Sequence, residues 1–166
     1  MTLDDADLLF ELDQDSEVMR FINKGKKTTL QEVHEVFIPR LKAYRNEVKG
    51  WGIWQVTLKD SGRYIGWVLV RPMAFFSENP ELENLELGWR FKRDIWGKGY
   101  ATEAACALKE ALINKGGIKK LSAIAVEANK ASTNVMLKLG MRYLKTELHK
   151  DPLGDAEVVF YEMTLV

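Results

Sequence analysis

Apolar residues along this chain follow two different spacings, and the spacing changes several times from one end to the other. They recur every three or four residues, as on one face of a helix, in residues 8–12, 30–44, 99–115 and 131–139. They alternate with polar residues, or form short runs typical of strands, in residues 54–58, 64–71, 85–91, 121–126, 141–148 and 158–165. By this alternation Trp51, Trp54 and Trp67 are expected mostly in the core, with the alternative that one of them lines an acceptor pocket. The order of segments predicts one mixed α/β domain over residues 1–166, with a mostly antiparallel, twisted sheet and one parallel crossover.

Local signals predict where several of these segments begin and end. Thr29 and Glu32 have the spacing of a capping box, which predicts a helix start just after Thr29. Pro39 lies inside the helical pattern that follows and is expected to kink or split that helix. Pro72 is expected to end the second strand, so residues 72–84 are predicted to form a long loop. The acids of this loop either attract cationic amines or simply face solvent.

Composition narrows the classes of protein that fit this chain. Lys plus Arg equals Asp plus Glu, at 24 each, so bulk positive charge does not favour nucleic acid as a partner. The one cysteine, Cys106, excludes an internal disulfide framework and favours a reducing, cytoplasmic location. Together with His34 and His149 it gives too few ligands for a zinc site, so no metal is expected. No apolar run approaches membrane-spanning length, so no membrane partner is expected either.

The segment from Glu86 to Ala104 carries the most chemical information. Its pattern predicts a strand, then a turn with Gly97 and Gly99, then the start of a helix. The first N–H groups of a helix have no intrahelical acceptor, and the peptide dipoles place partial positive charge there. Glycine has no Cβ and lets the backbone approach a phosphate closely. The segment therefore predicts an anion site for a phosphate-bearing ligand.

Two common phosphate-binding motifs do not fit this turn. A Walker loop needs Ser or Thr directly after its Lys, whereas Lys98 is followed by Gly99, and no glycine lies five residues before Gly97. A dinucleotide motif needs a third Gly or Ala where this chain has Thr102, and an acid about 20 residues further on. Nucleotide binding is therefore disfavoured.

Two segments together resemble one enzyme family. Residues Trp96-Gly-Lys-Gly-Tyr-Ala-Thr-Glu-Ala104, preceded by Glu86-Leu-Gly-Trp89, resemble motif A of the GNAT superfamily of N-acetyltransferases. The segment from Asn129 to Met141 resembles the family's N-x-x-S-x-x-x-x-x-K-x-G-F/M pattern, at the expected separation and after a strand. The resemblance covers most of the chain and is nearest to the branch with ribosomal-protein N-terminal acetyltransferases and spermidine acetyltransferase. It implies a GNAT-like fold with helices on both faces of the sheet, acetyl-CoA as donor and CoA as product.

The resemblance also implies how the donor is held. Backbone N–H groups from Gly97 to Thr102 would bind the pyrophosphate, and the backbone of residues 89–91 would pair with the pantetheine arm as an added strand does. Asn129 would lie near the thioester, with Ser132 one helical turn on. The expected cofactor-binding residues are Trp89, Arg90, Phe91, Trp96, Gly97, Lys98, Gly99, Tyr100, Ala101, Thr102, Asn129 and Ser132.

The chain departs from the family pattern in three places. Asp94 stands where Arg or Gln is usual, so its side chain must point away and Arg93 or Lys98 must supply the charge. Met136 stands where many relatives have a Tyr that protonates the departing thiolate. A thiol has a pKa of about 8.5 and leaves without full protonation, so Ser132 or water suffices. Residues 1–3 leave almost no room for the family's first strand, which is expected to be missing or shortened.

The implied chemistry is direct attack of an amine on the thioester. Glu86 is the candidate base, acting through a water; the alternative is an exposed acid at the start of its strand. The catalytic candidates are therefore Glu86 and Ser132. The acceptor would be a primary amine on a protein N-terminus or a small molecule, and the protein a monomer or homodimer. A CoA-binding module with weak or no catalysis is the alternative, because position 136 lacks a Tyr.

Overall fold

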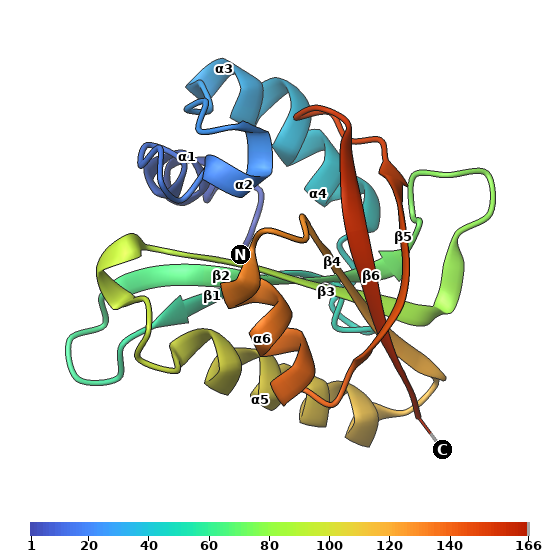
Figure 1. The fold of residues 1–166 in the computed structure, drawn as a ribbon. Coiled ribbons are helices and arrows are strands. Elements are labelled where there is room, and N and C mark those ends of the chain that lie inside the picture. The colour runs from blue at the N-terminus through green and yellow to red at the C-terminus, as the bar shows by residue number, and fades with distance from the viewer. Residues whose placement is uncertain (166) are drawn as a thin grey trace.

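A computed structural model describes residues 1–165, in which one six-stranded sheet carries helices on both faces (Figure 1). The helical segments are α1 (Ala6–Leu12), α2 (Arg20–Asn23), α3 (Leu30–Glu32), η1 (Val33–Phe37), α4 (Ile38–Tyr44), η2 (Arg93–Ile95), α5 (Tyr100–Lys115) and α6 (Lys130–Lys138). The strands are β1 (Gly52–Thr57), β2 (Tyr64–Met73), β3 (Glu81–Phe91), β4 (Lys120–Ala125), β5 (Arg142–His149) and β6 (Ala156–Thr164). The strand order is β1-β2-β3-β4-β6-β5, and only β3 and β4 run parallel, which confirms the predicted architecture.

Two layers of helices bury the two faces of the sheet. α1 to α4 lie over one face of β1–β3, and α5 lies against the other (Figure 1). The larger core joins α5 and α6 to the central strands and includes Leu85, Leu87 and Leu121, each almost fully buried. A smaller core joins α1 and η1 to the opposite face, around Leu9 and Val33. Successive residues of β3 therefore face different helical layers, because side chains alternate along a strand.

The N-terminal helices begin and bend where the sequence predicts. The Thr29 hydroxyl accepts a hydrogen bond from the Glu32 N–H (3.0 Å), and the Glu32 carboxylate accepts one from the Thr29 N–H (2.8 Å), which completes the capping box. The expected disturbance at Pro39 takes the form of a π-helical turn, η1, directly before α4. Pro39 lies in the first turn of α4, which continues directly from η1, and the wider π-helical turn accommodates the missing N–H.

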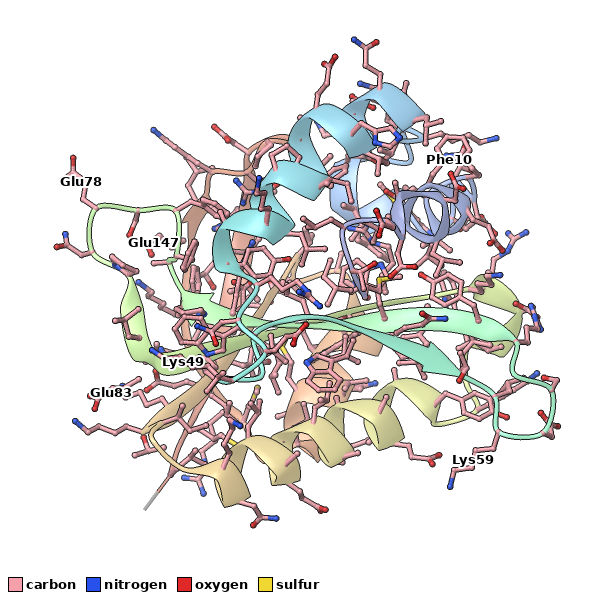
Figure 2. All side chains as sticks on the ribbon, turned by 180° about the vertical axis from the view of Figure 1, so that it is seen from behind. Phe10, Lys49, Lys59, Glu78, Glu83 and Glu147 are labelled. Atoms are coloured by element: carbon pink, nitrogen blue, oxygen red, sulfur yellow. The ribbon has the colours of Figure 1, made fainter. Side chains whose placement is uncertain are left out.

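The prediction that Pro72 ends the second strand is wrong. β2 continues to Met73, and the pairing with β3 becomes irregular between Pro72 and Met73. A proline is tolerated at such a bulge because no ladder N–H is required there. Because β3 begins at Glu81, the loop is shorter than the predicted residues 72–84. Of the three acids in that range, Glu81 and Glu83 belong to β3, and Glu78 remains in the loop and points into solvent (Figure 2).

The position predicted for Trp54 is also wrong, because its side chain is 46% exposed. Trp54 lies on the α5 side of β1, which is an edge strand with a neighbour on one side only. Its indole N–H donates to the Gly50 carbonyl (3.0 Å). Alternation predicts the face on which a side chain lies, but not whether another element covers that face. Trp51 and Trp67 are half-buried and pack against core residues as expected.

The free edge of β1 is met by the start of the chain. The ammonium group of Met1 donates to the Ile53 carbonyl of β1 (2.6 Å), and the Arg45 guanidinium donates to the Met1 carbonyl (3.2 Å). In the part of the chain that the structure describes, no strand precedes α1, in line with the expected missing or shortened first strand. None of the helices in residues 1–165 is both long and apolar enough to cross a membrane.

Candidate active site

The two parallel strands at the centre of the sheet separate after a short paired stretch. β3 and β4 pair at only three positions, from Asn84 with Lys120 to Glu86 with Ser122. Beyond Glu86, β3 pairs only with β2, and beyond Ser122, β4 pairs only with β6. The half of the sheet formed by β4, β6 and β5 turns steeply away from β1–β3 (Figure 1). The last five residues of β3 therefore have one edge without a partner strand, and such an edge can pair with the amides of an extended ligand.

A cavity of about 430 Å³ is lined by this open part of β3, by the turn after it and by α6. That volume lies within the usual range for small-molecule sites. Residues from four segments of the chain line it: Glu17, Val18, Phe21, Ile22, Trp89, Arg90, Phe91, Ile95, Trp96, Gly97, Gly99, Tyr100, Ala101, Thr102, Asn129, Ala131, Ser132, Asn134, Val135 and Lys138. Every residue predicted to bind the cofactor is in this set except Lys98.

The start of α5 opens into the cavity without a cap. Gly97 and Gly99 have φ angles of 72° and 83°, in the left-handed region that strongly favours glycine, and space alone would admit a Cβ at both. The first intrahelical bond runs from the Glu103 N–H to the Gly99 carbonyl, and no side chain caps the helix. The N–H groups of Tyr100, Ala101 and Thr102 are thus free to bind an anion at the positive end of a 16-residue helix.

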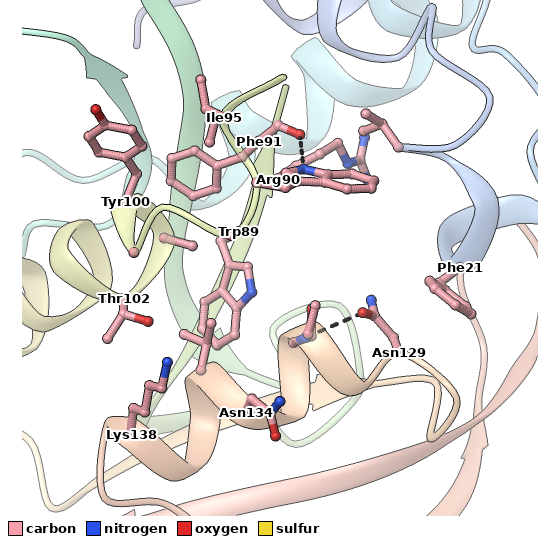
Figure 3. A pocket seen from close by; sticks show the side chains of 18 of the residues that line it. Phe21, Trp89, Arg90, Phe91, Ile95, Tyr100, Thr102, Asn129, Asn134 and Lys138 are labelled. Atoms are coloured by element: carbon pink, nitrogen blue, oxygen red, sulfur yellow. Dashed lines mark hydrogen bonds between the residues drawn. The ribbon is translucent and has the colours of Figure 1, made fainter. Parts of the chain in front are cut away.

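The turn between β3 and α5 is held by an aromatic side chain. The indole N–H of Trp96 donates to the Phe91 carbonyl at 2.9 Å, which closes the turn over η2 (Figure 3). The rest of the Trp96 side chain is 47% exposed and borders the cavity. A large apolar side chain left open beside a cavity is typical of a residue that contacts a ligand.

Two predicted residues at the start of α6 line the opposite wall. The Asn129 side-chain oxygen accepts the Ser132 N–H (3.3 Å) and caps α6, while its amide N–H groups are left for other partners (Figure 3). The Ser132 hydroxyl makes no hydrogen bond within residues 1–165, so it is free to donate. Met136 is 1% exposed and lies in the main core, away from the cavity lining.

Three charged residues near the turn, Asp94, Arg93 and Lys98, were candidates for helping or opposing a phosphate. Asp94 points away from the helix start, because its carboxylate binds the Arg63 guanidinium on the β1–β2 hairpin at 2.6 Å. That hydrogen bond lowers the pKa of Asp94. Arg93 is paired with Asp15 (3.2 Å), and Lys98 is exposed and outside the cavity lining.

Two cations among the described residues line the cavity, Arg90, which is paired with Asp13, and Lys138, which the sequence reasoning did not single out. Lys138 extends from the last turn of α6 toward Thr102 at the start of α5 (Figure 3), and it has no carboxylate partner among the described residues. Its position in the second family motif was visible in the sequence, but its direction depends on how α6 packs against α5.

Glu86 lies in the middle of β3 and not at the start of a strand. It is the last residue of β3 that pairs with β4, so it marks the point where the two strands separate. Its carboxylate accepts two hydrogen bonds from Arg71, at 2.8 Å from Nε and 3.3 Å from Nη2. Both side chains are almost buried, with 8% of Glu86 and 13% of Arg71 exposed. The two bonds occupy about two of the four lone-pair positions of the carboxylate, which leaves acceptor capacity for a water or an amine.

Aromatic residues surround this ion pair on the α4 side of the sheet. The Arg71 guanidinium carbon lies 5.7 Å from the ring centre of Tyr44 and 5.8 Å from that of Phe76. Burial opposes the charge on Arg71, but the Glu86 carboxylate outweighs it and raises the pKa of the guanidinium. Burial also raises the pKa of Tyr44 to about 12. Arg71 therefore stays charged and Tyr44 neutral across the physiological range.

A second buried ion pair fixes the helical layer beside the cavity. The Arg90 guanidinium donates to the Asp13 carboxylate at 2.6 Å, and the Thr28 hydroxyl donates to its other oxygen at 2.7 Å. Asp13 follows α1 directly, so this contact ties the N-terminal helices to the open part of β3. The wall formed by Glu17, Val18, Phe21 and Ile22 was missed as part of the site, although residues 18–22 are apolar in sequence.

A strand edge open to pairing, an uncapped helix start and a cavity between them form a site that suits an extended ligand carrying phosphate. In residues 1–165 no group of His, Cys, Asp and Glu side chains is arranged to hold a metal ion. The residues present therefore suit a ligand such as a coenzyme A thioester, with amides along its arm and a pyrophosphate further on.

Comparison with known proteins identifies the family. A family model described as "Acetyltransferase (GNAT) domain" matches residues 1–142 of this chain. YkkB of Bacillus subtilis, an uncharacterised protein, is 35% identical over 147 residues, which cover 86% of this chain and 78% of YkkB. The FsC-acetyl coenzyme A-N(2)-transacetylase of Aspergillus fumigatus is 29% identical over 143 residues, which cover 84% of this chain and 59% of that enzyme.

A solved structure shows the same fold. The aminoglycoside acetyltransferase AAC(6')-Ib, in complex with coenzyme A and kanamycin, has a TM-score of 0.76 and 20% identity, covering 99% of this chain and 91% of that chain. The chain therefore belongs to the GNAT acetyltransferase family and is an acetyl-CoA-dependent acyltransferase.

Proposed function

We propose that this protein transfers the acetyl group of acetyl-CoA to a primary amine by direct attack of the amine on the thioester. The observation that carries the proposal is the separation of β3 from β4, which opens a strand edge and a cavity. Glu86 marks the point of separation but is not among the residues that line this cavity. The new C–N bond forms as the C–S bond breaks, the amine gives up a proton, and CoA leaves as a thiol.

The residues of one wall would hold the donor. The free N–H groups at the start of α5 suit the pyrophosphate, and Lys138 adds a full positive charge beside them. The open edge of β3, from Trp89 to Phe91, suits the amides of the pantetheine arm. These contacts would direct the acetyl group toward the point where β3 and β4 separate.

Glu86 and Ser132 would move the protons. A free amine is mostly protonated near neutral pH, so a base must take its proton. Glu86 would do so through a water molecule that donates a hydrogen bond to a carboxylate lone pair not occupied by Arg71. The unbonded hydroxyl of Ser132 would donate to the departing sulfur in place of the Tyr that position 136 lacks. A backbone N–H of β3, fixed before reaction, would stabilise the negative charge on the carbonyl oxygen.

The acceptor is the finer part of the proposal. The sequence resemblance favours the N-terminus of a ribosomal protein or a polyamine such as spermidine, and the relatives add an N(2)-acetylated substrate and an aminoglycoside as further amines to test. All of these acceptors present a primary amine. We also propose a cytoplasmic location, from the single cysteine.

Two measurements test the function in sequence. A thermal-shift comparison should show stabilisation by acetyl-CoA and CoA, and none by NAD or ATP. Thiol release is then measured with an amine panel of N-terminal peptides, spermidine and kanamycin. Release that depends on one of the amines supports the proposal, with heat-treated protein as the control. Stabilisation by acetyl-CoA with no thiol release across a broad panel would instead favour a CoA-binding module, the alternative raised by Met136.

A further inference from the structure

β5 is an edge strand that no other element within residues 1–165 covers. Seven of its eight residues are exposed, on both faces of the strand, and only His149 is half-buried. Three large apolar side chains are among them, with exposed fractions of 57% for Tyr143, 50% for Leu144 and 61% for Leu148. An exposed, apolar edge strand of this length presents unpaired backbone groups that can pair with another strand.

The other edge of the sheet is less open. β1 has six residues, and the Met1 ammonium group already occupies the Ile53 carbonyl on it. An antiparallel bridge between Asn46 and Trp51 folds the preceding loop back beside the same strand. β5 is therefore the better surface for pairing between chains.

Symmetry limits how two copies of β5 can pair. In an antiparallel pair, residues opposite each other point to the same face of the sheet. A two-fold axis perpendicular to the sheet must therefore pass midway between the two copies of one residue, which then lie opposite each other. An axis at Lys145 would place Lys145 opposite Lys145, and an axis at Glu147 would place Glu147 opposite Glu147. Like charges directly opposite each other are destabilising, so neither register is favoured.

An axis at Thr146 gives a self-complementary register. Lys145 of each copy then lies opposite Glu147 of the other, twice in the interface. Within one chain Lys145 and Glu147 already lie close, with 2.7 Å between the ammonium and the carboxylate, so both side chains share one face of β5. Opposite charges therefore face each other when two copies pair in this register.

We infer that the protein forms a two-fold symmetric homodimer by antiparallel pairing of β5 with β5 of a second copy, centred on Thr146. Two features of β5 are of the kind that discourages pairing of an edge strand with another chain. They are the register irregularity between Tyr143 and Lys145 and the charge of Lys145 itself. Glu147 of the same chain already pairs with that charge at 2.7 Å, and in the dimer the partner's Glu147 lies opposite it as well. The regular stretch, Lys145 to His149, contains the two charged positions. The zero formal net charge of the chain adds no overall repulsion between copies.

Charge reversal and rescue test this interface. Sedimentation of the 166-residue chain over a range of concentrations should show a species of twice 19.0 kDa. The K145E chain and the E147K chain each place like charges opposite one another, so each alone should dimerise at least about tenfold more weakly. The double variant K145E/E147K restores opposite charges and should dimerise as the parent does. An equimolar mixture of the two single variants should form heterodimers for the same reason.

Glu110→Lys is the matched control, because Glu110 is an exposed acid on α5, far in sequence from β5, with no ion pair within residues 1–165. It should leave dimerisation unchanged. Hydrogen exchange should also show protection of the residue 143–149 amides that increases with protein concentration. A parent chain that stays monomeric at high concentration would refute the inference. So would a dimer that neither single variant weakens, since its interface would then lie elsewhere.

Discussion

The ion pair between Arg71 and Glu86 gives the sharpest test of the proposed active site. Replacing Glu86 with Gln removes the countercharge of a guanidinium that is only 13% exposed and is bonded at 2.8 and 3.3 Å. Breaking a buried pair on one side costs about 3–5 kcal/mol, because the remaining charge stays buried without a partner. We expect the Glu86→Gln variant to lose about 3 kcal/mol of unfolding free energy, a large part of the total stability of a typical domain.

A control on the same strand separates burial from charge. Glu83 of β3 is paired with Lys119 at 2.6 Å, but 59% of its side chain is exposed and points to solvent (Figure 2). Solvent screens such a pair, so Glu83→Gln should cost less than about 1 kcal/mol. Urea unfolding at neutral pH measures both variants. Equal losses in the two would refute the argument that burial makes the Glu86 pair costly.

A double variant separates stability from catalysis. Arg71→Met combined with Glu86→Gln removes both charges, so it should be about 2 kcal/mol more stable than the sum of the two single losses predicts. If Glu86 takes the proton of the amine, this double variant should release thiol at least about a hundredfold more slowly than the parent even though it is folded. Recovery of the parent's turnover and pH–rate profile in the double variant would show that Glu86 is not the base.

Three further predictions address the donor site and the buried tyrosine. Gly99→Ala places a Cβ on a residue with φ of 83°, so it should cost about 1–2 kcal/mol in urea unfolding and weaken acetyl-CoA binding measured by calorimetry; unchanged binding would mean that the helix start does not hold the phosphate. Lys138→Met should weaken acetyl-CoA binding about tenfold at low salt and less at high salt, because it removes one charge-assisted contact. Lys98→Met is the control and should change binding little; the opposite order would assign the charge to Lys98. Tyr44 has its pKa raised by burial from 10.0 to about 12, so its contribution to stability is complete below pH 10 and is lost as the pH rises through about 12. Between pH 10 and about 12 the parent should therefore lose about 2–3 kcal/mol more unfolding free energy than the Tyr44→Phe variant. Parallel curves of unfolding free energy against pH for the two proteins would contradict a raised pKa of Tyr44.

Local patterns in the sequence predicted most elements to within a few residues. The capping box at Thr29, the glycine stop after Lys115 and the strand–turn–helix around Gly97 and Gly99 act through neighbours in the chain, so they can be read without knowing the fold. The errors occurred where a distant neighbour decides the outcome. Pro72 lies at an irregular position in a strand pair, and Trp54 lies on an edge strand that nothing covers.

The helix start that is proposed to bind the donor could be predicted from residue type and local order alone. The free N–H groups at the start of α5 follow from a glycine turn and a helix, and both are local consequences of residue type. The residues that line the cavity from the turn and from α6 were therefore predictable from two motifs.

The partners of the charged side chains, in contrast, depend on contacts between distant parts of the chain. Whether Asp94 opposes a phosphate depends on Arg63, 31 positions earlier, and whether Glu86 is an exposed acid or a buried, paired one depends on Arg71 in the neighbouring strand. Lys138 reaches the cavity only because α6 packs beside α5. The physical reason is the same in each case: electrostatic contacts act over a few ångströms in space, and the pairing of strands and helices, not the order of residues, sets those distances.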